Sequence, residues 1–119
     1  MSPDIAGLTA RLVQFRDARD WRQFHTLKNL VAAMNVEAGE LLELTQWKET
    51  PELEKVASDD LLRATFSREI ADVFIYLLLV CEKLGIDPVL AADQKVLENE
   101  KKYPVEKARG TARKYTELG

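Results

Sequence analysis

The sequence has the length and balance of a single soluble globular domain. Its 119 residues are 46% apolar and 31% charged, with a formal net charge of −3. This charge gives no electrostatic reason to expect a nucleic-acid partner, and none is predicted. A chain of this length buries a limited share of its surface, so wide apolar helix faces favour association with further copies. We therefore expect one domain over residues 1–119 that forms an oligomer.

The apolar segments are too short to place the chain in a membrane. Residues 73–81 form the longest one, which is about half the length that spans a bilayer. Residues 1–4 lack the basic start and apolar run of a secretory signal. The single cysteine, Cys81, has no partner for an intrachain disulfide, which is typical of a reducing compartment. We expect a cytoplasmic protein without a membrane partner.

Two helices are predicted in the first half of the chain. Ser2 and Pro3 are typical of an N-cap and a first turn, and apolar residues recur at helical spacing after them. This pattern predicts a helix over residues 3–19. A second run of the same spacing predicts a helix over residues 27–47. Pro51 cannot continue a helix, so the segment around it is expected to be a linker.

Two further helices are predicted in the second half. Apolar residues keep helical spacing as far as Gly85, a residue typical of helix ends, which predicts a long helix over residues 59–84. Asp87 and Pro88 begin a fourth helix, over residues 88–102, and the rest is expected to be a tail. No segment of useful length shows the alternating pattern of a strand. The predicted class is all-α, with a four-helix bundle-like fold.

Two pairs of carboxylates stand three residues apart on the second and third predicted helices. Glu37 and Glu40 share one face of the second helix, as Glu69 and Asp72 do on the third. Each acidic pair lies at the border of the apolar stripe of its own helix. Such spacing is also common on solvated helix faces, so one pair alone would not indicate a site. Two pairs beside the predicted core favour one.

This acidic pattern predicts a metal ion. Four carboxylates at the seam of two helices would repel one another and lose hydration, at a cost of several kcal/mol per ion unless a cation compensates. All candidate ligands are hard oxygens, which favours Mg²⁺, with Mn²⁺ as a second choice. Mg²⁺ also accepts phosphate oxygens, so a phosphorylated substrate would fit. A di-iron site would need Glu-x-x-His motifs, and the chain has none.

Two other groups of residues are candidates for substrate contacts. Lys95, Asn99 and Lys102 fall on one face of the fourth helix, a pattern that suits either polyphosphate binding or a solvated lysine-rich face. Tyr103 follows this face directly. Four residues near the ends of the second helix are candidates to stack on a nucleobase or read its edge, and the alternative is that Trp21 and Phe24 cover the bundle end. They are Trp21, Phe24, His25 and Trp47.

Several segments taken together resemble one enzyme family. They are residues 20–25, 37–41, 46–48, 69–76, 103–105, 109–110 and 114–116. On these segments the chain resembles the MazG-like all-α nucleoside triphosphate pyrophosphohydrolases, and within them the dCTP pyrophosphatase branch. The resemblance spans nearly the whole chain.

The resemblance implies an activity, residue roles and an assembly. The activity is hydrolysis of a nucleoside triphosphate, dCTP or a modified dCTP above all, to the monophosphate and pyrophosphate. The implied catalytic residues and Mg²⁺ ligands are the four carboxylates Glu37, Glu40, Glu69 and Asp72. The implied phosphate contacts are Lys95, Asn99, Lys102 and Tyr103, and the implied base and sugar pocket is Trp21, His25, Trp47 and Tyr76. The implied assembly is a homotetramer, a dimer of dimers in which neighbouring subunits complete each site.

Two positions depart from the family pattern. The wider family often has a second Glu before the first ligand, where this chain has Val36 as in the narrower branch. The phosphate segment commonly has Arg before the Tyr-Pro pair, where this chain has Lys102, so a bidentate phosphate contact is lost. Two alternatives stay open: a broad house-cleaning nucleoside triphosphate pyrophosphatase, and a non-catalytic helical protein that binds nucleotides.

Overall fold

The structure, a computed structural model, describes residues 2–119, and within this range it contains helices and turns without a β-strand. The four long helices are α1 (Ile5–Ala18), α2 (Leu27–Glu43), α4 (Asp60–Leu84) and α5 (Pro88–Lys102). The one-turn helices are α3 (Thr50–Leu53) and α6 (Val105–Ala108), and the 3₁₀ turns are Arg22–Phe24, Val56–Ser58 and Tyr115–Glu117. The predicted all-α class is confirmed, and each of the four predicted helices has a counterpart.

Each long helix begins at a residue whose short side chain caps it. The Asp4 carboxylate accepts a hydrogen bond from the backbone N–H of Gly7 at 2.7 Å. Thr26, Asp59 and Asp87 cap α2, α4 and α5 in the same way. Such caps satisfy N–H groups that have no partner inside the helix. Because Asp4 is the cap, the first helix begins at Ile5 and not at the expected residue 3.

The second helix is shorter than expected. It ends at Glu43, and residues 44–47 form hydrogen-bonded turns instead of the predicted last helical turn. The Thr45 hydroxyl donates to the Leu42 carbonyl at 2.7 Å, a local bond that competes with the helix ladder. Trp47 has a left-handed backbone with a φ of 65°, which a right-handed helix cannot include. These two features explain the earlier end.

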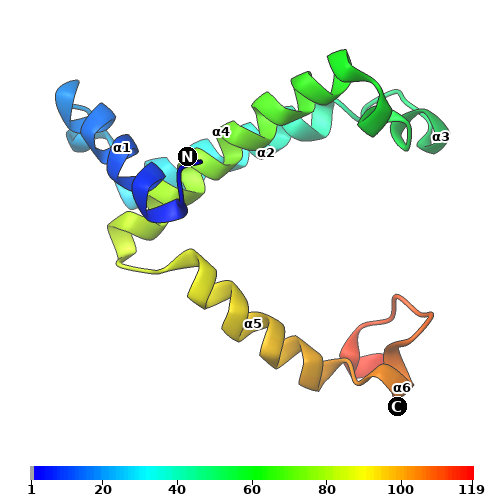
Figure 1. Cartoon of the computed structure of the whole chain (residues 1–119). Coiled ribbons are helices and arrows are strands. Elements are labelled where there is room, and N and C mark those ends of the chain that lie inside the picture. The colour runs from blue at the N-terminus through cyan, green and yellow to red at the C-terminus, as the bar shows by residue number, and fades with distance from the viewer. Residues whose placement is uncertain (1) are drawn as a thin grey trace. The chain divides into compact units, whose positions relative to one another are not determined.

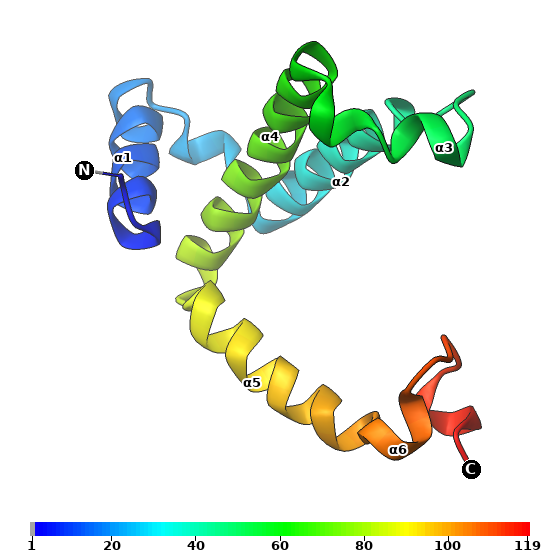
Figure 2. The ribbon, with the colours of Figure 1, turned by 45° about the vertical axis from the view of Figure 1, so that its right-hand side comes forward.

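Backbone contacts divide the chain into two compact units, one that ends at Gly85 and one from Ile86 to Gly119. In the first unit α2 and α4 lie side by side, and α1 packs on α4 (Figures 1 and 2). The buried apolar side chains come from α2 and α4. They are Leu30, Leu78, Leu79 and Cys81. This seam between α2 and α4 is where the predicted acidic pairs lie.

The second unit contains α5 and a folded C-terminal segment. The Tyr103 and Tyr115 rings meet edge to face with centroids 6.1 Å apart. The Lys102 ammonium lies 4.9 Å from the centroid of the Tyr115 ring. Aromatic pairs and cation–π contacts of this kind hold segments together. The expectation of a tail after residue 102 is therefore wrong for this segment, which forms α6 and a final 3₁₀ turn.

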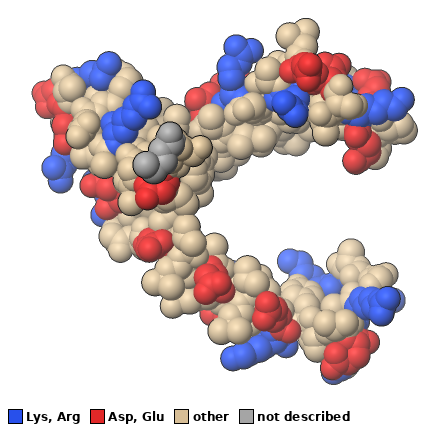
Figure 3. Space-filling view, in the orientation of Figure 1, with Lys and Arg blue, Asp and Glu red and all other residues tan. Residues whose placement is uncertain are grey.

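The surface carries charged side chains of both signs. Figure 3 shows Lys and Arg beside Asp and Glu over each of the two units on the face in view. Among the residues described, no helix has both the length and the apolar character needed to cross a bilayer.

Candidate metal centre and adjoining pocket

Three of the four predicted metal ligands meet at the seam between α2 and α4. Glu37 and Glu40 stand one turn apart on α2, and Glu69 lies on α4. Each of the three offers a carboxylate oxygen, and these oxygens lie within 4.8 Å of one another. The three-residue spacing puts the first two on one helix face, and the packing of the helices brings the third against them. We call these three residues the acidic cluster.

The ionised forms of two carboxyl groups in the acidic cluster are destabilised, which raises their pKa values. The pKa of Glu37 is raised from 4.5 to about 7, first by a hydrogen bond with the Glu40 carboxyl group, then by burial and neighbouring carboxylates. The pKa of Glu69 is also raised, first by burial and then by the charges of Glu40 and Asp72. Both shifts have the sign expected when carboxylates are crowded away from water.

The acidic cluster fits a divalent metal ion. One oxygen of Glu37 and one of Glu69, the Oε2 atom in each, are buried and have no hydrogen-bond partner. Buried carboxylate oxygens without partners are costly, and a cation would satisfy them. The donor set consists of carboxylates, which hard cations such as Mg²⁺ and Mn²⁺ prefer. The residues present therefore suit the group that the sequence predicted.

A pocket adjoins the acidic cluster. Its volume is about 420 Å³, within the range of small-molecule sites. Its walls come from α1, the connection after it, α2 and α4. The lining residues are Leu8, Arg11, Leu12, Phe15, Arg16, Trp21, His25, Glu37, Asp72, Ile75, Tyr76 and Leu79. The fourth predicted ligand, Asp72, thus lies outside the acidic cluster but shares the pocket with Glu37.

Three of the four residues predicted for base and sugar contacts line this pocket: Trp21, His25 and Tyr76. The Trp21 ring packs edge to face on Phe15, with centroids 5.7 Å apart. The backbone N–H of Trp21 donates to the Arg16 carbonyl at 3.0 Å, which ties this residue to the end of α1. These residues give the apolar pocket an aromatic wall suited to a planar ring.

His25, which lines the same pocket, has a ring nitrogen without a partner. Its Nδ1 atom is buried and has no hydrogen-bond partner. The pKa of His25 is lowered, first by burial and then by the positive charges of Arg16 and Lys83, which favours the neutral ring. A neutral imidazole has one donor and one acceptor, so it can bind the edge of a bound heterocycle.

Trp47, the fourth residue of the predicted base pocket, lies elsewhere. It is 94% exposed, follows the end of α2 and does not line the pocket. A fully exposed tryptophan is uncommon, because its ring gains most from burial. For Phe24 the sequence allowed either stacking on a base or covering the bundle end. This residue is 61% exposed and also lies outside the pocket.

The predicted phosphate residues all belong to the second unit. Lys95, Asn99 and Lys102 are exposed on α5, at positions that share one helix face, and Tyr103 is partly buried at its end. The Lys95 ammonium pairs with the Glu98 carboxylate at 3.1 Å on the surface. Exposed pairs of this spacing are weak, so a phosphate could displace the carboxylate.

The pocket contains residues that the sequence analysis did not single out. The most notable are Arg11 and Arg16, together with Ile75 and Leu79 on the facing helix. A signal for Arg16 was present: Leu8, Leu12 and Arg16 are four residues apart, so an arginine continues the apolar stripe of the first helix. Charged residues in such stripes are unusual and indicate a buried pair or a site.

Comparison with known families and proteins agrees with these features. A model of the MazG-like family matches residues 32–118, a range that contains the acidic cluster and all of the second unit except Gly119. Proteins named dCTP pyrophosphatase 1 from Rattus norvegicus and Homo sapiens are each 38% identical over 116 residues. That alignment covers 98% of this chain and 68% of each relative.

A solved structure also resembles the chain. It is the crystal structure of a pyrophosphatase from Archaeoglobus fulgidus, which superposes with a TM-score of 0.76 and is 38% identical. The match covers 87% of this chain and 95% of that one. The likeness therefore extends over both fold and sequence.

Proposed function

Because this chain belongs to the MazG-like family, we propose that it is a nucleoside triphosphate pyrophosphohydrolase acting on dCTP or a base-modified dCTP. The products are the nucleoside monophosphate and pyrophosphate. The observation that carries the proposal is the pocket with an aromatic wall whose lining includes Glu37 of the acidic cluster. The dCTP preference is supported by the relatives named dCTP pyrophosphatase 1.

The proposed cofactor is Mg²⁺, with Mn²⁺ as its substitute. Glu37, Glu40 and Glu69 would hold it, and Asp72 would contribute from the pocket side. When bound, the ion neutralises charge on the triphosphate and makes water more acidic at neutral pH. The four carboxylates would hold the ion, and through it the α-phosphate, in one place, which is the main requirement of phosphoryl transfer.

The proposed reaction is an in-line displacement. Water adds its oxygen to the α-phosphorus, the bond from that phosphorus to the bridging oxygen breaks, and pyrophosphate leaves. The proton released by the water passes to one of the four carboxylates. These are Glu37, Glu40, Glu69 and Asp72, the proposed catalytic residues.

The rest of the proposed site binds the substrate. Trp21, His25 and Tyr76 would contact the base and sugar from the pocket wall. Trp47, which is exposed, would complete this pocket across a subunit interface in a homotetramer built as a dimer of dimers. The proposed phosphate contacts on the second unit are Lys95, Asn99, Lys102 and Tyr103. In this proposal both units act as one catalytic domain.

Exposed apolar side chains support the proposed assembly. No residue of α5 is buried, even though the helix carries apolar side chains. Those more than half exposed are Val89, Leu90, Val96 and Leu97. Exposed apolar faces of this kind mark interaction surfaces.

We place the protein in the cytoplasm, with no nucleic-acid or membrane partner, a proposal that its buried free Cys81 supports.

Product analysis tests the proposed function. The purified protein is incubated with Mg²⁺ and each common dNTP or NTP, and monophosphate, diphosphate, pyrophosphate and phosphate are separated. Fastest release of dCMP and pyrophosphate would support both the reaction and the substrate. Similar rates over many nucleotides would favour the broad house-cleaning enzyme. Binding of dCTP without turnover under any divalent metal would favour the non-catalytic nucleotide-binding protein.

A further inference from the structure

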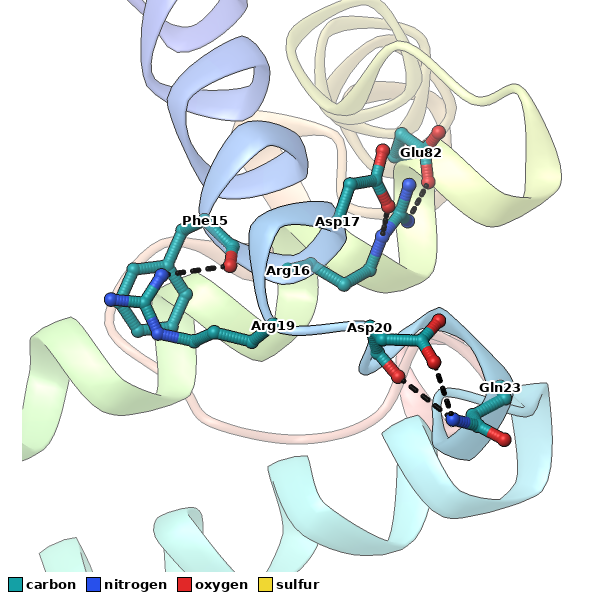
Figure 4. Close-up of polar contacts among 7 residues, drawn as sticks. All are labelled: Phe15, Arg16, Asp17, Arg19, Asp20, Gln23 and Glu82. Atoms are coloured by element: carbon teal, nitrogen blue, oxygen red, sulfur yellow. Dashed lines mark hydrogen bonds and ion pairs between the residues drawn. The ribbon is translucent and has the colours of Figure 1, made fainter.

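Arg16 is the buried charged residue of the described chain, with 6% of its surface exposed. An arginine is seldom buried unless it is paired, because the guanidinium group loses its hydration. Its Nε donates to Asp17 Oδ1 at 2.9 Å and its Nη1 donates to Glu82 Oε2 at 3.1 Å, as Figure 4 shows. These two carboxylates allow Arg16 to stand in the apolar stripe of α1.

The two bonds differ in what they join. Asp17 is the next residue on α1, whereas Glu82 lies in the last turn of α4, 66 residues further along the chain. Among the residues from 2 to 119, the other ion pairs join residues three or fewer positions apart. The Arg16–Glu82 pair is therefore the ion pair that joins two helices in this part of the chain.

The helix that this pair fastens forms one wall of the pocket. Leu8, Leu12 and Phe15 line the pocket from α1, opposite residues of α4. The backbone carbonyl of Arg16 also accepts a hydrogen bond from the backbone N–H of Trp21 at 3.0 Å, and the Trp21 ring packs on Phe15. Arg16 thus contacts α4 through its side chain and Trp21 through its backbone.

We propose that Arg16 is a positioning residue which, through Glu82, holds the α1 wall and Trp21 against α4 and so determines how tightly the pocket binds its nucleoside. The identity of the ligand rests on the proposed function, whereas the link itself rests on the contacts above. The acidic cluster lies on α2 and α4, which pack directly on each other. Breaking the pair should therefore weaken binding and leave the chemical step largely intact.

Steady-state kinetics with dCTP and Mg²⁺ provide the first test. R16M and E82A each break the Arg16–Glu82 pair, and we expect KM to rise about tenfold while kcat stays within about threefold of wild type. D17A is the matched control, because it removes the neighbouring bond but not the link between helices, and we expect a KM near that of wild type. R16K keeps the charge and should recover part of the lost affinity.

Trp21 fluorescence provides a second test that needs no turnover. In a W47F background Trp21 is the single tryptophan, and its emission is measured without nucleotide. We expect R16M and E82A to shift the emission to the red as Trp21 leaves the wall, with D17A unshifted and far-UV circular dichroism unchanged in all three. If R16M loses its helix content, E82A, which keeps the buried arginine and its bond to Asp17, decides the test.

The outcomes separate this inference from the proposed function. Unshifted emission in E82A would overturn the positioning role, as would a loss of kcat at constant KM. A wild-type chain that turns over no nucleotide would overturn the proposed function. The emission measurement would still decide whether the pair holds the α1 wall.

Discussion

At the scale of residues, the acidic cluster places three carboxylates within 4.8 Å of one another at a helix seam. Charges this close either take up protons or bind a cation. The raised pKa of Glu37 favours the uptake of a proton. The proposed function predicts the second whenever Mg²⁺ is present.

Removing single carboxylate charges should abolish turnover without unfolding the protein. We expect E40Q and D72N each to lower kcat by about a hundredfold or more, because charge stabilisation at the phosphate is lost. Helix content by circular dichroism should match that of wild type. Mg²⁺ should raise the melting temperature of wild type more than that of E40Q.

The control for this pair of variants is E52Q, which removes an exposed carboxylate on α3, away from the acidic cluster. We expect E52Q to keep wild-type turnover and its response to Mg²⁺. Near-normal activity in both E40Q and D72N would contradict the metal assignment.

His25 should make stability depend on pH. Its folded-state pKa lies below the ordinary 6.5, first because of burial and then because of Arg16 and Lys83. A lowered pKa contributes stability that is present above pH 6.5 and is lost as the pH falls through the folded-state value. We expect the melting temperature of wild type, relative to that of H25Q and measured without metal, to fall as the pH is lowered from about 7.5 to about 5.5.

Only the difference between these two proteins isolates His25. Glu37 has a raised pKa, so its ionisation lowers the stability of wild type and H25Q alike as the pH rises. A difference that stays constant, or that grows in favour of wild type on acidification, would contradict the assignment of His25 as a partly buried, neutral residue.

At the scale of elements, α4 depends on how its last turn ends. Gly85 follows the helix with φ 67° and ψ 33°, and its N–H bonds the carbonyls of Cys81 and Glu82. This left-handed conformation is strained for a side chain with a Cβ atom. Since Glu82 lies in this last turn, the cap also supports the partner of Arg16.

We expect G85A to lower the free energy of unfolding by about 1 kcal/mol, measured by urea denaturation. The matched variant is G85N, which should cost less, because asparagine tolerates the left-handed region better than alanine. No heavy atom lies within 4 Å of a Cβ built at Gly85, so the cost is one of backbone conformation and not of a clash. Equal losses in the two variants would contradict this reason.

At the scale of the whole molecule, the buried core is small for the number of apolar residues in the chain. Leu30, Leu78, Leu79 and Cys81 are the buried apolar side chains of the described residues. By contrast Val36, Leu42 and Leu61 are each more than 60% exposed. Apolar faces left uncovered to this extent favour association of subunits.

We expect the wild-type protein to be a homotetramer by multi-angle light scattering. L90E/L97E places two charges on the exposed apolar face of α5, two turns apart. It should lower the measured mass, because an acidic residue is costly at an apolar interface. The matched control is Q94E/K101E, which has the same spacing on the same helix at polar positions. A wild-type monomer, or an unchanged mass in L90E/L97E, would contradict this prediction.

The sequence could predict the helices well because helix formation depends on local spacing and caps. α1, α2, α4 and α5 all lie within their predicted ranges or end close to them. The predictions were wrong where contacts between residues distant in the chain, or a left-handed backbone conformation, determine the local structure. The segment after residue 102 folds because Tyr103 meets Tyr115, and α2 ends early because of the turn that leads to Trp47.

The sequence by itself determined the all-α class and the two acidic pairs, because residues three apart share a helix face whatever the fold. Only the tertiary structure decided that Glu69 joins Glu37 and Glu40 while Asp72 faces the pocket. It also decided that Arg16 is buried against Glu82. The physical reason is that these contacts join α1, α2 and α4, and no local pattern states how two helices pack against each other.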